Sequence, residues 1–358
     1  MQDQDRRFLE TILGRPGEGA GWRTLFRHGS VLTLTRTSAR RDLPSLYRPQ
    51  KGFSRLAYGL VGLSRRFGIP GPQNGKILQF SEGRESLVHQ IEGELEAKVV
   101  SLLIGNPVQS QRRFLGLVEG FQGRDRSVLK AGFTSEARWA IESERTLLRK
   151  LGGRVPGVPP LLGELNGPGS SFQAFLLDWV TGRKATESEA LGHLDKWSGE
   201  GKKPLREFPE WPGILGQWNR AGLGRGQGDK AGAIRLTPSL MHGDYAPWNL
   251  LVDQEENFRA LDWEAAREDG IPALDWVHYL YQIEKLLGSR GFAPSLERIG
   301  ARLRLGDSRA FLNRVGWGED WPWLIMVYLA TNWLIGDRER PELLRTAEQF
   351  LFQDHRSH

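Results

Sequence analysis

The chain has 358 residues and no cysteine, which excludes disulfide bonds and thiolate metal sites. Hydrophobic residues make up 39% of it and charged residues 26%, as in an ordinary globular protein. Its length exceeds what one compact core usually holds, so we expect two lobes or a domain with an extension. The net charge of +6 favours an anionic partner over a polycationic substrate.

Residues 1–95 form a basic N-terminal extension whose role the sequence does not assign. Residues 1–7 lack the apolar core of a signal peptide, and no apolar run is long enough to span a bilayer, so we expect a cytoplasmic protein. The apolar residues 56–63 are flanked by basic ones, namely Arg48, Lys51, Arg55, Arg65 and Arg66. Such a stretch either makes a peripheral contact with a membrane surface or packs on the neighbouring lobe, which is commoner. No nucleic-acid motif accompanies it, and we expect no nucleic-acid partner.

Three strands and a helix follow the extension. Residues 97–104, 114–119 and 127–131 have the apolar composition of strands, and residues 135–151 have helical periodicity. Thr134 or Ser135 can cap the start of this helix. Glu144 falls on the apolar stripe, whereas Glu142 shares the solvated face with Arg138, Arg145 and Arg149. Because a buried carboxylate needs a cation, we pair Glu144 with Lys130, near the end of the third strand.

The rest of the chain is predominantly helical in pattern. Residues 172–177 predict one more strand, and residues 183–237 are rich in charge, glycine and tryptophan. Residues 276–287, 296–305 and 321–334 predict helices. The many tryptophans of this part could stack on sugars or cage a quaternary ammonium group, but helix packing is the commoner use.

Polar residues gather between short apolar runs at residues 240–275. Residues 250–252 and 259–261 suit strands and are joined by the polar residues 253–257, so the pair predicts a hairpin. Asn249 precedes its first strand and Asp262 follows its second. We therefore expect these two oxygen-bearing side chains to converge on one cation.

The order of residues in this stretch is that of a phosphotransferase motif. A His-Gly-Asp triplet at 242–244 is followed after four residues by Asn249, and later by Asp262-Trp263-Glu264. The stretch resembles the aminoglycoside phosphotransferase and choline kinase-like family of small-molecule kinases, which share the protein-kinase fold. Separations of this kind are much harder to obtain by chance than any single Asp or His.

The resemblance implies a bilobal α+β protein-kinase-like fold with ATP and Mg²⁺ as cofactors. The kinase-like N-lobe, built on an antiparallel sheet, would cover residues 96–178, and a mostly helical C-lobe with the catalytic loop would cover residues 179–358. Residues 105–110 would cover the phosphates, although they contain only one glycine.

Roles in the catalytic loop follow from the same resemblance. Asp244 resembles the catalytic base, and His242 would brace the catalytic loop beside it. Asn249 and Asp262 resemble the Mg²⁺ ligands, and Asp275 would anchor the loop in the helical lobe.

Nucleotide contacts are assigned to the first lobe. Lys130 resembles the lysine that pairs with the α and β phosphates, with Glu144 as its partner. Asp178, Trp179 and Val180 stand where the hinge between the lobes meets the adenine ring.

These assignments predict a phosphotransferase that acts on a hydroxyl group of a small molecule. The acceptor that we favour is a sugar or a sugar-containing metabolite. Choline- or ethanolamine-type and aminoglycoside-type kinases stay open, as does a catalytically weak nucleotide-binding scaffold. A protein substrate is disfavoured because no Ala-Pro-Glu segment follows Asp262.

Overall fold

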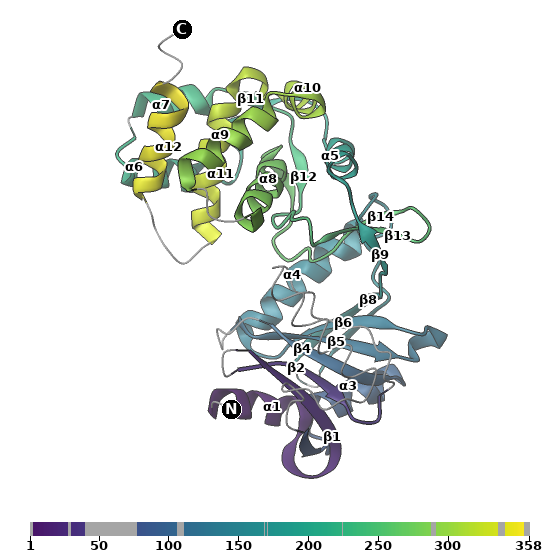
Figure 1. Ribbon diagram of the computed structural model, residues 1–358. Helices are drawn as coiled ribbons and strands as arrows, with labels where there is room; N and C mark the ends of the chain where they lie inside the picture. The colour runs from purple at the N-terminus through teal and green to yellow at the C-terminus, as the bar shows by residue number, and fades with distance from the viewer. Residues whose placement is uncertain are drawn as a thin grey trace. The chain divides into compact units, whose positions relative to one another are not determined.

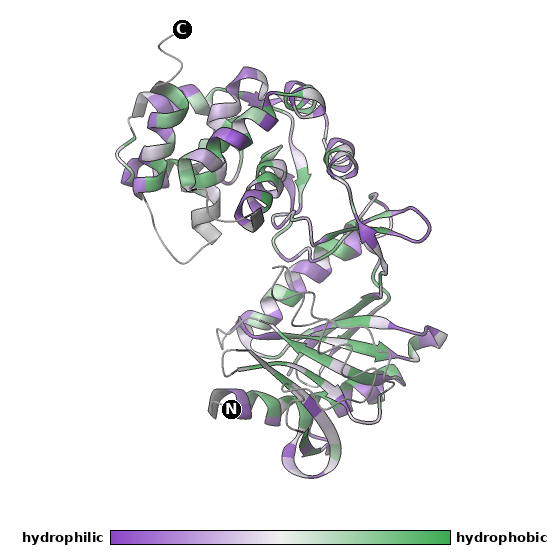
Figure 2. Ribbon diagram, in the orientation of Figure 1, coloured by the Kyte–Doolittle hydropathy of each residue, from purple (hydrophilic) through white to green (hydrophobic). Residues whose placement is uncertain are grey.

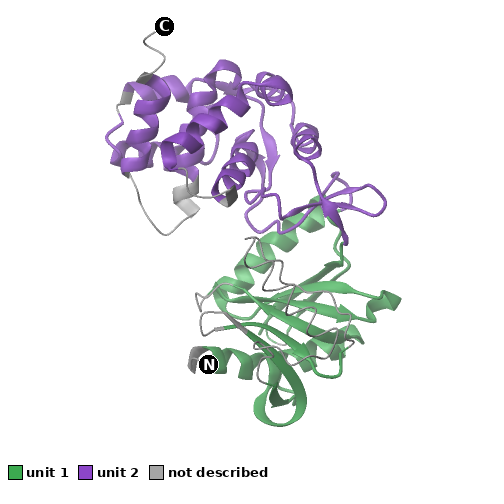
Figure 3. Ribbon diagram, in the orientation of Figure 1, with its two compact units in different colours: residues 1–152, 159–180 green, residues 153–158, 181–358 purple. Residues whose placement is uncertain are grey.

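The computed structural model describes residues 3–27, 30–39, 77–105, 111–167, 169, 171–223, 225–287, 291–335 and 341–353. The chain divides into two compact units (Figure 3), one made of residues 1–152 and 159–180 and the other of residues 153–158 and 181–358. The apolar residues 56–63 and most of the connection at 105–110 lie outside the described residues, so what we expect of them stays a prediction.

The first unit is built on one eight-stranded sheet in which every neighbouring pair is antiparallel (Figure 1). In spatial order its strands are β3 (Ile77–Ser81), β1 (Arg15–Arg27), β2 (Ser30–Arg36), β4 (Lys98–Ile104), β5 (Arg113–Glu119), β6 (Ser127–Gly132), β8 (Gln173–Asp178) and β7 (Gly163–Asn166). Apolar residues predominate in the central strands (Figure 2). The four strands predicted from residue 97 onward are confirmed as β4, β5, β6 and β8.

The N-terminal residues that the sequence sets apart as an extension supply three strands of this sheet. β2 pairs with β4 in a register that places Thr33 opposite Leu103. An ion pair of 2.6 Å between Asp5 and Arg112, both almost fully buried, fastens α1 (Asp3–Leu13) to the residue before β5. Residues 1–95 and the following strands therefore share one compact unit. The strands of residues 1–95 are hard to predict from the sequence, because β1 is rich in Gly and carries a Pro, which lower strand propensity.

Helices pack on both faces of the sheet. One face carries the main core, to which α1, α3 (Leu87–Leu95) and alternate residues of the strands, such as Leu129 and Ala131, contribute. Lys130 lies between these two residues and points to the other face, where α4 (Ser135–Leu151) packs on β6 and β8. The predicted bounds of α4 are confirmed, and the Thr134 hydroxyl accepts a hydrogen bond of 3.2 Å from Ala137 N.

One residue of α4 departs from its prediction. Arg145 was expected on the solvated face, but its side chain is only 5% exposed. It donates a hydrogen bond of 3.0 Å to Asn166 Oδ1 on β7 and forms an ion pair with Glu142. Helical periodicity alone missed this, because β7 approaches the flank of the helix and offers acceptors there.

The second unit is mostly helical. Its α-helices are α5 (Glu187–Lys196), α6 (Trp211–Arg220), α7 (Arg225–Gly232), α8 (Leu274–Leu287), α9 (Phe292–Leu303), α10 (Gly306–Val315), α11 (Trp321–Ile335) and α12 (Pro341–Gln353). Two short 3-10 helices also belong to this unit, η4 (Leu205–Glu207) and η5 (Gly318–Asp320), and a third, η2 (Phe121–Gly123), belongs to the first unit. Helix α11 is apolar on all sides because it packs against α6, α8, α9 and α12. Among the described helices none is both long and apolar enough to cross a membrane.

Three small sheets complete this unit and carry the polar stretch. β14 (Phe258–Ala260), β13 (Leu250–Asp253) and β9 (Gly182–Lys184) form one, which confirms the predicted hairpin with Leu250 opposite Ala260. β12 (Ser239–Met241) pairs with β15 (Arg267–Gly270), and β10 (Lys203–Pro204) pairs with β11 (Arg235–Leu236). The loop of residues 242–249 therefore runs from the end of β12 to the start of the hairpin.

Candidate active site

The loop of residues 242–249 turns sharply at Gly243. The backbone φ of this residue is +84°, and a Cβ atom placed on it would lie 2.5 Å from the carbonyl oxygen of Ala265. Glycine is the residue that accepts both the left-handed conformation and the close approach of a second backbone. The turn directly before Asp244 therefore requires a glycine at position 243.

Asp275 anchors the start of this loop. It lies in the first turn of α8, and its two carboxylate oxygens accept hydrogen bonds from His242 N (2.6 Å) and Gly243 N (2.9 Å). Complete burial raises the pKa of Asp275 to about 6, although the two backbone N–H groups act in the opposite direction. These contacts confirm the expected anchor.

His242 is fully buried and braces the loop from inside. Its Nε2 donates to Leu261 O at 3.0 Å, and its Nδ1 accepts from Asp244 N at 3.3 Å. Its ring packs on the indole of Trp263, with 4.7 Å between the ring centroids. Both nitrogens are engaged with the backbone, which suits the predicted bracing role rather than proton transfer to a substrate.

The side chain of Asp244 is held at both oxygens. Oδ1 lies 3.1 Å from His278 Nε2, and Oδ2 accepts from the Asn249 amide nitrogen at 3.0 Å. Burial by itself raises the pKa of Asp244, but the hydrogen bond and the electrostatic interaction with His278 outweigh it, and the net pKa lies below its usual value. This carboxylate is therefore ionised at neutral pH and can accept a proton.

His278 is the site residue that sequence reasoning missed. It lies on α8 one turn after Asp275, so the two side chains share a helix face. That spacing is a signal the sequence contains. It could not be used beforehand, because only the packing of α8 against the loop shows which face of the helix meets Asp244.

The hairpin brings the two predicted metal ligands together. Leu261 N donates to Asn249 O at 2.8 Å, which extends the hairpin by one step beyond Leu250 and Ala260. Asp262 follows in a left-handed conformation, with φ of +72°, and its negative charge acts to raise the pKa of Asp244, so the two carboxylates are near one another.

The donor atoms at this point suit Mg²⁺. The amide nitrogen of Asn249 donates to Asp244, which leaves the amide oxygen as the atom that could bind a cation. In the described ranges no three His, Cys, Asp or Glu side chains gather into a metal cluster. A site with few protein ligands is typical of Mg²⁺, which keeps waters and binds substrate phosphates.

The candidate nucleotide residues lie in the first unit. Lys130 Nζ contacts the two Glu144 carboxylate oxygens at 2.7 and 3.0 Å, with side chains 11% and 1% exposed, so the predicted pair is present. Asp178 ends β8 and accepts a hydrogen bond of 2.7 Å from Arg124. Trp179 and Val180 follow it, and Val180 is the last residue of the first unit along the chain.

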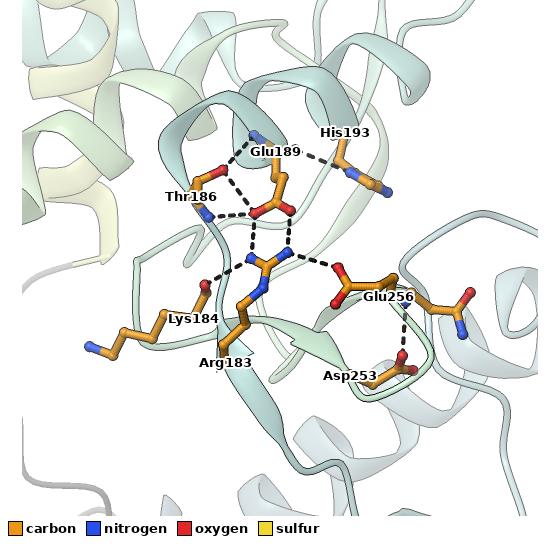
Figure 4. Close-up of polar contacts among 8 residues, drawn as sticks. Arg183, Lys184, Thr186, Glu189, His193, Asp253 and Glu256 are labelled. Atoms are coloured by element: carbon orange, nitrogen blue, oxygen red, sulfur yellow. Dashed lines mark hydrogen bonds and ion pairs between the residues drawn. The ribbon is translucent and has the colours of Figure 1, made fainter.

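An exposed ion-pair network lies at the beginning of the second unit (Figure 4). The guanidinium of Arg183 donates to both Glu189 oxygens at 2.8 and 2.7 Å and to Glu256 at 2.9 Å. Glu189 also completes a capping box with Thr186 at the start of α5. The hydrogen bond from Arg183 and those from Thr186 lower the pKa of Glu189 to about 2. This network links β9, α5 and the hairpin that precedes Asp262.

No family model matches the chain. Among solved structures, choline kinase LicA from Streptococcus pneumoniae is similar at 11% identity and a TM-score of 0.38, covering 74% of this chain and 96% of that chain. A protein described as a fructosamine-3-kinase from Haemophilus somnus 129PT is similar at 13% identity and a TM-score of 0.38, covering 74% of this chain and 95% of that one. Both likenesses are too remote to assign a role to any residue of this chain.

Proposed function

We propose that this protein is an ATP- and Mg²⁺-dependent phosphotransferase that phosphorylates a hydroxyl group of a small molecule. The observation that carries the proposal is the Asp244 carboxylate. It is ionised, bonded at both oxygens and set on a loop anchored by Asp275, with the Asn249 amide oxygen and Asp262 beside it. Phosphoryl transfer requires a fixed proton acceptor next to hard oxygen ligands.

Each residue then has a defined task. Asp244 orients the acceptor hydroxyl and takes its proton as the bond to phosphorus forms. Asn249 and Asp262 would hold Mg²⁺, which when bound bridges the phosphates and offsets their charge. Lys130, held in place by Glu144, would contact the nucleotide phosphates. We assign the adenine contact to the backbone of residues 178–180.

A carboxylate that takes the proton of a hydroxyl needs no charged group on the acceptor, so we propose a neutral, hydroxyl-rich acceptor such as a sugar. The net charge of +6 also disfavours a polycationic aminoglycoside. We therefore rank sugars and sugar-containing metabolites ahead of amino alcohols and aminoglycosides.

The test is acceptor-dependent release of ADP from Mg²⁺-ATP with sugars, amino alcohols and aminoglycosides as acceptors. Asp244→Asn should lower the turnover number about 10²- to 10⁴-fold, because the amide cannot accept the proton. Asp229→Asn, at an exposed carboxylate on α7, is the matched control and should behave like the wild type. If no acceptor raised ADP release while nucleotide still bound equally to wild type and Asp244→Asn, the protein would be a nucleotide-binding scaffold instead.

A further inference from the structure

A buried chain of side chains ends at the Asp244 carboxylate. Tyr328 Oη on α11 lies 3.1 Å from His278 Nδ1, and His278 Nε2 on α8 lies 3.1 Å from Asp244 Oδ1. His278 is 8% exposed and Tyr328 3%. The Gln282 amide also approaches His278 Nε2, at 3.1 Å. Side chains from two helices of the second unit thus form a chain that ends at one oxygen of Asp244.

The chemistry of these partners fixes the hydrogens. An ionised carboxylate only accepts, so the hydrogen of the imidazole must be on Nε2, facing Asp244. In the neutral tautomer with this hydrogen, Nδ1 carries a lone pair and accepts from the Tyr328 hydroxyl. Gln282 shares the Nε2 hydrogen when its amide oxygen is turned toward the ring, since oxygen and nitrogen of an amide can exchange places. In this arrangement each nitrogen of the ring has a partner.

We propose that His278 is a positioning residue for Asp244, and that Tyr328 sets the tautomer in which His278 does this; the inference rests on the proposed phosphotransferase function. With Oδ2 held by Asn249 and Oδ1 by His278, the carboxylate cannot rotate away from the acceptor hydroxyl. Misplacement of a catalytic group by about 1 Å can cost about a hundredfold in rate. Loss of His278 should therefore slow turnover without weakening nucleotide binding.

The experiment compares four variants on an acceptor that the wild type phosphorylates. His278→Phe keeps a ring but removes both nitrogens, and its turnover number should fall about 10- to 100-fold with an unchanged KM for ATP. His278→Gln restores an N–H near the same place and should recover most of that loss. Tyr328→Phe, which removes one hydroxyl, should lower the turnover number by less, about three- to tenfold. His193→Gln is the control, because His193 stacks on Phe258 instead.

The outcomes separate the inference from the function on which it rests. Recovery in His278→Gln, with a melting temperature and ADP affinity like those of the wild type in all variants, supports the inference. A wild-type turnover number in His278→Phe or in Tyr328→Phe would overturn it. Equal losses in His278→Phe and His278→Gln would also overturn it, since they would indicate packing alone. If the wild type itself turned over no acceptor, the phosphotransferase proposal would fail and the inference with it.

Discussion

The buried carboxyl group of Asp275 should make the stability of the protein depend on pH. Burial raises its pKa from 3.8 to about 6 in the folded protein. Because the folded state holds this proton more tightly than the unfolded chain, the stabilisation by Asp275 is complete below pH 3.8 and is lost as the pH rises through about 6. The difference between the two pKa values corresponds to about 3 kcal/mol, of which roughly 1 kcal/mol is lost between about pH 5 and about pH 7.

The assay is urea unfolding of the wild type and Asp275→Asn at several pH values in that range. At every pH the variant should be less stable than the wild type by about 1–3 kcal/mol. The reason is that its amide nitrogen faces a backbone N–H from which the carboxylate oxygen accepted a hydrogen bond. The decisive quantity is the unfolding free energy of the wild type minus that of the variant, which should shrink by roughly 1 kcal/mol from the lowest to the highest pH. Asp229→Asn, at an exposed site, should follow the pH dependence of the wild type. Parallel curves for wild type and Asp275→Asn would refute the reasoning.

Three further substitutions test other parts of the structure. Lys130→Met removes the cation 2.7 Å from the buried Glu144 carboxylate, so the free energy of unfolding in urea should fall by about 3 kcal/mol, and ADP release should fall as well. An unchanged free energy of unfolding would contradict a buried pair. Gly243→Ala places a Cβ against Ala265 O at a φ of +84°, so the free energy of unfolding should fall by about 1–3 kcal/mol and ADP release at least tenfold. ADP release at the wild-type rate would refute the tight turn. Arg183→Ala removes exposed ion pairs, so its melting temperature should match that of the wild type, and a clear fall would show that the network is stronger than its exposure implies.

Features that depend on neighbouring residues in the chain could be predicted from the sequence. The bounds of α4 follow from a threonine cap and helical periodicity, and the hairpin of β13 and β14 follows from two apolar runs around a polar turn. The pairing of Lys130 with Glu144 could also be predicted, because a glutamate on an apolar stripe leaves few ways to offset its charge.

Features that depend on distant residues could not be predicted. The pairing of β2 with β4 joins residues far apart in the chain, and the glycines of β1 hide the strand pattern of its neighbourhood. The burial of Arg145 could not be predicted, because its partner Asn166 lies on β7, outside the helix. His278 was missed because its contact with Asp244 spans 34 positions and depends on how α8 packs.

The same distinction explains why Asp244 on the loop and Asp275 on α8 differ in chemistry. The family resemblance gives Asp244 and Asp275 different roles, and their surroundings move the two pKa values in opposite directions. Burial raises the pKa of Asp275 more than the backbone N–H groups of His242 and Gly243 lower it, so its proton is bound more tightly and its contribution is structural. Asp244 faces His278 and Asn249, whose polar hydrogens stabilise the charge, so it stays ionised and able to accept a proton from a hydroxyl. The motif therefore supplies the carboxylates, and the packing of α8 decides which of them can act as the base.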